Sequence, residues 1–222
     1  MQKFDTPAAI SAVLDIPAGR IRFIAADRGD TTVEIRPADA GKSRDTKAAE
    51  QTTVAYEDGV LRIETPDTGH RVLGPSGALE VTVQLPAGSH VDAKAADGEL
   101  RGVGRLGNVT FQGAQGTVKL DETAAARLTL QAGDIQVGRL GADGEISTQK
   151  GDLQVAEAVR GALTLRTEQG DISVGAARGT SARLDAGTAY GRIDNALTNP
   201  AEAITLTVKA TTAHGDITAR SL

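Results

Sequence analysis

The feature that most constrains the fold is a five-residue motif that recurs through the C-terminal part of the chain. Gly151–Val155 reads Gly-Asp-Leu-Gln-Val, and close copies begin at Gly133 and Gly170. Weaker copies raise the number of aligned glycines to seven, separated by 18, 17, 18, 19, 21 and 24 residues. A repeat of this period is typical of a solenoid, in which each copy forms one coil on top of the last. The aligned glycines are Gly98, Gly116, Gly133, Gly151, Gly170, Gly191 and Gly215.

The residues around each glycine predict two strands joined by a sharp corner. Positions two residues after the glycine are large and aliphatic in every copy, and apolar residues also recur five and seven residues before it. Such alternation places one face of each strand inside. One coil could not bury that face alone, whereas stacked coils about 4.8 Å apart can. We expect the glycine to supply a positive φ at the corner. The aliphatic column is Leu100, Val118, Ile135, Leu153, Ile172, Ile193 and Ile217.

We therefore predict an all-β fold, a single β-solenoid of about 18 residues per rung. A right-handed parallel β-helix is expected, because parallel crossover connections strongly prefer that hand. Left-handed β-helices also use about 18 residues per coil, but their hexapeptide pattern is absent from this sequence. Residues 91–222 form the regular repeats.

Residues 1–90 have strands of the same length without a clean period, so they are expected to be either irregular rungs or an antiparallel cap. Asp58-Gly59 between alternating segments predicts a hairpin. Gly77–Leu85 is the clearest single strand, and the polar stretch 37–51 is expected to be a loop with at most a short helix over 46–51. No Pro- or Ser-rich linker separates the two parts, so we predict that they form one continuous domain.

Composition narrows the function classes. Aromatic residues make up 2% of the chain, so the core must be built from small, regular packing units. There is no cysteine, and the net charge of -5 argues against nucleic acid as the main partner. No apolar run is long enough for membrane insertion, and no signal-peptide pattern follows Met1, so a cytoplasmic location is expected.

The residue after the corner glycine is acidic in five of the seven copies, which makes it the best candidate for chemistry. Asp134, Asp152 and Asp171 are expected to stack as a carboxylate ladder. Such a ladder could bind Ca²⁺ or a cationic ligand, or each Asp could stabilise its corner by accepting backbone N–H groups. A threonine recurs three residues before the glycine in four copies and is expected to point inward as a hydroxyl ladder. No catalytic motif is present, no cofactor is implied, and the histidines, which lack metal-ligand spacing, are His70, His90 and His214.

A family resemblance rests on the repeated Thr-x-x-Gly-Asp-Ile/Leu-x-Val pattern. It also rests on Leu85-Pro-Ala-Gly88 and on the opening Gly19-Arg-Ile-Arg-Phe23. Over about residues 10–220 the chain resembles the bacterial "putative adhesin" family, β-strand-repeat domains of unknown function. The resemblance implies a fold and a link to adhesion, and it carries no catalytic residues to this chain.

These observations favour a non-catalytic structural or protein-interaction module that associates through the ends of its solenoid. Open ends expose unpaired strand edges, which promote association between copies. An adhesive or carbohydrate-binding module is the alternative. A polysaccharide-active enzyme is the lower alternative, since the Asp column could imitate paired catalytic carboxylates.

Overall fold

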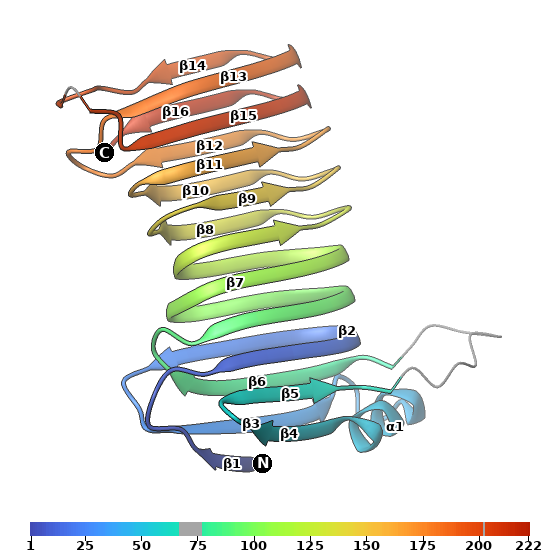
Figure 1. Cartoon of the computed structure of the whole chain (residues 1–222). Helices are drawn as coiled ribbons and strands as arrows, with labels where there is room; N and C mark the ends of the chain where they lie inside the picture. Colours follow the sequence, from blue (N-terminus) through green and yellow to red (C-terminus); the bar gives the residue numbers. More distant parts are fainter. Residues whose placement is uncertain (67–76, 202) are drawn as a thin grey trace.

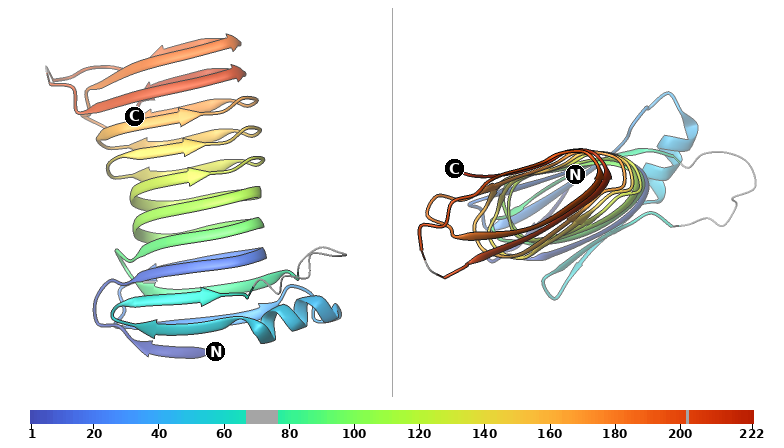
Figure 2. Two further views of the ribbon diagram at one scale, coloured as in Figure 1. Left: turned by 45° about the vertical axis from the view of Figure 1, so that its right-hand side comes forward. Right: turned by 90° about the horizontal axis from the view of Figure 1, so that it is seen from above.

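In a computed structural model, the chain forms a tall stack of flattened coils, each made of two strands on opposite faces (Figure 1). The structure describes residues 1–66, 77–201 and 203–222. Seen along the stack, the coils superpose on a narrow outline from which one helix projects (Figure 2). All strands belong to one hydrogen-bonded sheet that wraps around the core, so the predicted all-β class is confirmed. Among the described residues, no helix is long and apolar enough to cross a membrane.

The N-terminal part mixes parallel rungs with antiparallel strands. Strand β2 (Ser11–Ala26) pairs in parallel with β5 (Val60–Glu64) on one face and with β6 (Leu79–Pro86) on the other. Beyond these, β1 (Gln2–Asp5), β3 (Asp30–Pro37) and β4 (Thr53–Glu57) pair antiparallel. The region therefore combines parallel rungs with antiparallel strands.

Two local expectations for this region have different outcomes. The β4–β5 hairpin is confirmed, and both Asp58 and Gly59 have positive φ, as a tight two-residue turn requires. The polar stretch 37–51 does contain a helix at the place where a short one was possible, but α1 (Ser43–Gln51) begins three residues earlier than the expected 46–51. The helix is held on the stack by Asp45, which is buried and accepts the backbone N–H of Ala78 at 3.0 Å. The full extent of the helix was difficult to predict because its sequence is almost wholly polar.

The regular part begins with β7 (His90–Thr129), a single unbroken strand that winds through more than two coils. After it the corners interrupt the strands. On one face lie β9 (Gly144–Ser147), β11 (Gly161–Arg166), β13 (Ala182–Tyr190) and β15 (Leu206–His214). On the other lie β8 (Ile135–Leu140), β10 (Leu153–Ala158), β12 (Ile172–Ala176), β14 (Ile193–Ala196) and β16 (Ile217–Ser221). All neighbours here pair in parallel.

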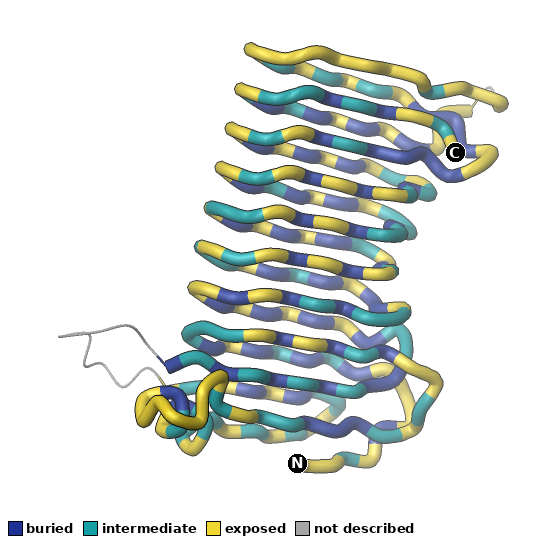
Figure 3. The backbone as a smooth tube through the Cα atoms, turned by 180° about the vertical axis from the view of Figure 1, so that it is seen from behind, coloured by how far each residue is buried: buried dark blue, intermediate teal, exposed yellow. Residues whose placement is uncertain are grey.

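The core is the set of inward-facing aliphatic columns, and buried and exposed residues alternate along every inner coil (Figure 3). Leu153 pairs with Ile135 on one side and Ile172 on the other, and all three are at most 1% exposed. One hydrophobic cluster extends from Ile10 to Ile217. Stacked aliphatic residues of like size make up most of this core, and Phe23 and Phe111 are its fully buried aromatic members.

The spatial order of the rungs differs from their order in the chain. The last strand pair, β15 and β16, lies between the β11/β12 rung and the β13/β14 rung. The sequence led us to expect the last copy at the end of the stack, and that expectation is wrong. Strand β2 near the N-terminus is inserted in the same way, since it lies between the β5/β6 rung and β7.

The inserted position of β15 and β16 has a physical reason. Their inward side chains Val208, Ala210 and Ile217 are all 0% exposed. The outermost rung is less apolar at two other facing positions, where Ala182 stands opposite Leu206 and Asn195 opposite Ala219. Burial of apolar surface favours the more apolar rung inside and the other at the end.

Candidate functional site

The corner glycines form one column along the side of the stack. A Cβ on Gly151 would lie 2.2 Å from the carbonyl oxygen of Gly133, and one on Gly133 would lie 1.6 Å from that of Gly116. Six of the seven predicted glycines have positive φ; Gly98 does not. Gly19, which the sequence alignment did not include, belongs to the same column, because it pairs with Gly98. No side chain fits where the backbones of adjacent corners approach so closely.

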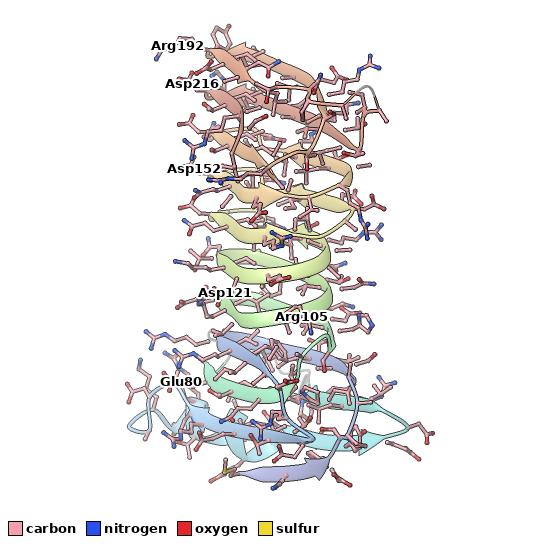
Figure 4. The ribbon with its side chains drawn as sticks, turned by 90° about the vertical axis from the view of Figure 1, so that its left-hand side faces the viewer. Glu80, Arg105, Asp121, Asp152, Arg192 and Asp216 are labelled. Atoms are coloured by element: carbon pink, nitrogen blue, oxygen red, sulfur yellow. The ribbon has the colours of Figure 1, made fainter. Side chains whose placement is uncertain are left out.

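The aspartates after these glycines stack on the outside of the corner. One carboxylate oxygen of each accepts the backbone N–H of the next residue in the column: Asp134 from Asp152 at 2.9 Å, Asp152 from Asp171 at 2.8 Å, and Asp171 from Asp216 at 2.7 Å. Asp216 in turn accepts the N–H of Arg192 at 2.8 Å. Figure 4 shows Asp152, Asp216 and Arg192 along one side of the stack.

This geometry matches the corner-stabilising alternative for the ladder. Each carboxylate satisfies a backbone donor that the sharp turn would otherwise leave without a strand partner. The column also follows the spatial order rather than the chain order, since Asp216 comes before Arg192. Arg192 has no carboxylate to offer a further rung, and its guanidinium lies 3.5 Å from the second oxygen of Asp216. Within the described residues, no group of three or more acidic or histidine side chains is gathered as a metal site.

The threonine column lies on the inner side of the same corners, as predicted, but its partners are different. The hydroxyl of Thr167 donates to the carbonyl of Gly151 at 3.1 Å, and Thr212 donates to that of Gly170 at 3.0 Å. Thr148 and Thr188 bond the equivalent carbonyls of Gly133 and Gly215. The threonines therefore bind glycine carbonyls, and they do not form a chain of hydroxyls.

The polar side chains at these corners are hydrogen-bonded to the backbone. In the described part of the chain, every buried side-chain nitrogen or oxygen has a hydrogen-bond partner. In the Asp column one carboxylate oxygen of each side chain accepts a backbone N–H, and in the Thr column each hydroxyl donates to a glycine carbonyl. Both columns therefore supply hydrogen bonds that stabilise the corners.

Two of the three histidines have defined surroundings. The Nδ1 atom of His90 accepts the backbone N–H of Asn108 at 2.9 Å. His214 stacks on Tyr190, with ring centroids 4.8 Å apart and planes 3° from parallel. His70 lies outside the described residues.

A shallow hollow of about 310 Å³ lies on the face that carries β8 and β10. Its polar lining consists of Lys119, Asp121, Gln136 and Gln154. Its floor is low because Gly138 and Ala156 stand where longer side chains would fill the surface. A Cβ on Gly138 would meet the carbonyl of Asp121 at 2.4 Å, so the floor cannot easily be filled. This hollow could not be predicted from the sequence, because its residues come from three different coils.

The two ends of the stack are built differently. At the N-terminal end, Phe4 of β1 and Tyr56 of β4 meet across the mouth, with ring centroids 5.5 Å apart. At the C-terminal end, β13 pairs only with β15, and β14 only with β16. Tyr190 and Ile193 of this last turn are 71% and 46% exposed, and its coil is the most exposed in Figure 3.

Comparison with solved structures finds similar chains in bacterial proteins. A "putative adhesin" from Bacteroides fragilis is 14% identical, with a TM-score of 0.51, and the match covers 98% of this chain and 95% of that one. A "putative lipid binding protein" from Parabacteroides distasonis is 12% identical, with a TM-score of 0.48 and coverage of 97% and 95%. A "putative adhesin" from the same species is 15% identical, with a TM-score of 0.41 and coverage of 100% and 95%.

At these identities the likeness concerns the fold alone. No curated protein matches the chain. A family model does match, over residues 15–221, and it agrees with the resemblance inferred from the repeats. The chain belongs to the Toastrack DUF4097 family.

Proposed function

We propose that this protein is a non-catalytic interaction module that associates with other copies through an end of its solenoid. The observation that carries the proposal is the outermost rung, β13 and β14, which has a neighbouring rung on one side only. A strand edge with free N–H and C=O groups beside exposed apolar side chains favours association. The use of the Asp and Thr columns for backbone bonding supports a structural rather than a catalytic role.

Light scattering over a wide range of protein concentration tests this function. We expect the mass of the purified chain to rise with concentration towards a defined oligomer. Electron microscopy of the same samples then distinguishes a closed oligomer from a filament. A constant monomer mass at every concentration, with the β-sheet circular dichroism intact, would contradict self-association.

A ligand-binding or adhesive module is the second candidate, and the hollow beside β8 and β10 favours it. Stacked amides of Gln136 and Gln154 beside Lys119 and Asp121 offer both donors and acceptors, the chemistry that recognises sugar hydroxyls. Calorimetry with a panel of bacterial polysaccharides tests it. Binding that is lost in Gln154→Ala and kept in the control Gln112→Ala would support this function, and the absence of heat across the panel would argue against it.

The finer features of the fold belong to the same proposal. We expect a right-handed coil of about 18 residues per rung, which the spacing of the motif suggests. We also expect residues 1–90 and 91–222 to form one folding unit, which the continuous core cluster supports. An experimental structure would decide the hand, and a single cooperative unfolding transition would support one domain. The cytoplasmic location stays a prediction.

A further inference from the structure

The two ends of the solenoid differ in how easily another copy could bind them. The N-terminal end finishes in two short strands, β1 and β4. Lys3 of β1 is paired with Asp30, and Phe4 of β1 packs against Tyr56 of β4. Short, charged edge strands of this kind discourage pairing. The C-terminal end finishes in β13, a nine-residue strand that pairs with β15 alone among the described strands. At its start Ala182 donates its N–H to Oδ1 of Asn199 at 2.9 Å, and the rest of its outer edge is the longest unpaired edge in the described part of the chain.

The interior is also uncovered at the C-terminal end. Leu163 and Leu165 of the inner strand β11 are 1% and 0% exposed. The residues that follow them in the same columns of the outermost rung, Leu184 and Ala186, are only partly buried. A neighbouring rung is what buries these columns elsewhere in the stack, so a further rung at this end would bury them too.

Resting on the proposed self-association, we propose that two copies join through their C-terminal ends as a two-fold dimer, with β13 of one copy pairing antiparallel to β13 of the other. Because only the C-terminal end presents a long strand edge among the described strands, the contact must use that same surface on both copies. An interface of that kind is complete with two molecules, whereas head-to-tail contacts would continue into a filament.

The charges on β13 fit such a pairing. Arg183 and Asp185 are exposed and lie two residues apart, on the outer face of the strand. In an antiparallel pair centred on Leu184, Arg183 of each copy lies directly opposite Asp185 of the other, so two ion pairs form at once. Within the described residues, neither side chain is in an ion pair of its own chain. Opposite charges at facing positions stabilise antiparallel strands and like charges destabilise them.

Charge exchange on this strand tests the dimer, measured by sedimentation equilibrium. Arg183→Asp and Asp185→Arg each place like charges face to face, and each is expected to raise the dimer dissociation constant at least tenfold, roughly. The double variant restores both pairs with the charges exchanged, and its dissociation constant should return to within about threefold of the original. Arg166→Asp, the same change on the inner strand β11, is the control and should leave the dimer unchanged.

A symmetric disulfide provides an independent measurement. Leu184 lies on the proposed axis, so Leu184→Cys should form a disulfide between copies on mild oxidation, in a chain that has no other cysteine. Leu163→Cys, in the equivalent position of an inner rung, should not. A dimer unaffected by Arg183→Asp, no cross-link at position 184, or filaments in place of dimers would each overturn this arrangement while leaving self-association standing. A chain that is monomeric throughout would overturn both.

Discussion

The inserted position of β15 makes a prediction that engineered cysteines can test. Thr211 of β15 lies beside Arg166 of β11 on one side and beside Gly187 of β13 on the other. If the rungs followed the chain order, Arg166 would instead be the neighbour of Gly187. The two arrangements therefore differ in which pair of positions is adjacent.

The distances make the outcome decisive. Neighbouring strands lie about 4.8 Å apart, which is within the Cα separation that a disulfide spans, roughly 4.4–6.8 Å. Positions 166 and 187 are two strand spacings apart in the structure, about 9.6 Å, which exceeds that limit. Arg166→Cys combined with Thr211→Cys should form an intramolecular disulfide under mild oxidation. Arg166→Cys combined with Gly187→Cys should keep two free thiols.

Thiol counting by mass spectrometry, before and after reduction, gives the result, because the natural chain has no cysteine to confuse it. Non-reducing electrophoresis separates a disulfide within one chain from one between two copies. Thr211→Cys with Gly187→Cys is the positive control, since these positions are neighbours in the structure. An intramolecular disulfide between positions 166 and 187, with none between 166 and 211, would refute the inserted rung.

Four further predictions concern the corners and the N-terminal strands. In denaturant titrations, Gly151→Ala should lower the free energy of unfolding by about 2–5 kcal/mol, because the new Cβ would lie 2.2 Å from a carbonyl oxygen on a residue with a φ of 142°. The control Gly187→Ala has nothing within 4 Å of its new Cβ and should change the free energy by less than about 0.5 kcal/mol. Thr167→Val should cost about 1–2 kcal/mol in the same assay, since a glycine carbonyl loses its donor. Asp152→Asn keeps an acceptor oxygen and should be nearly neutral, while Asp152→Ala should cost about 1 kcal/mol, and equal effects of the two would contradict the backbone-bonding role. Hydrogen bonds from Arg28 and then from Lys3 lower the pKa of Asp30 to about 2. The contribution of Asp30 to stability is therefore complete above its ordinary pKa of 3.8 and is lost as the pH falls towards 2. Asp30→Asn should flatten the dependence of the unfolding free energy on pH between these two values.

The sequence could predict the architecture because each rung repeats the same local physics. Alternating aliphatics such as Leu153 and Val155 fix which side of a strand faces inward, and Gly151 marks the corner at which the strand turns. These features depend on neighbours in the chain and on identical neighbours in the stack. A periodic sequence therefore specifies them several times over.

The order of stacking could not be read from the same pattern, because a period gives no information about which copy lies next to which. The decisive features are differences between copies. Asp216 can both donate its N–H to Asp171 and accept that of Arg192, whereas Arg192 can only be the last in the column. The Phe4–Tyr56 contact could not be predicted from the sequence either, because it joins two strands that are far apart in the chain.

The threading also explains how an open end can remain ordered. The last strands of a solenoid would fray first if they were attached to the stack by one ladder and ended in a free terminus. Here the C-terminal strand β16 has a ladder on each side, with β12 and with β14, and the rung that does end the stack is connected to the chain at both of its own ends. The exposed strand β13 is therefore held in place from both directions along the chain. It can present its free edge and its uncovered apolar side chains without unfolding, and this is the condition that a contact surface for a second copy must meet.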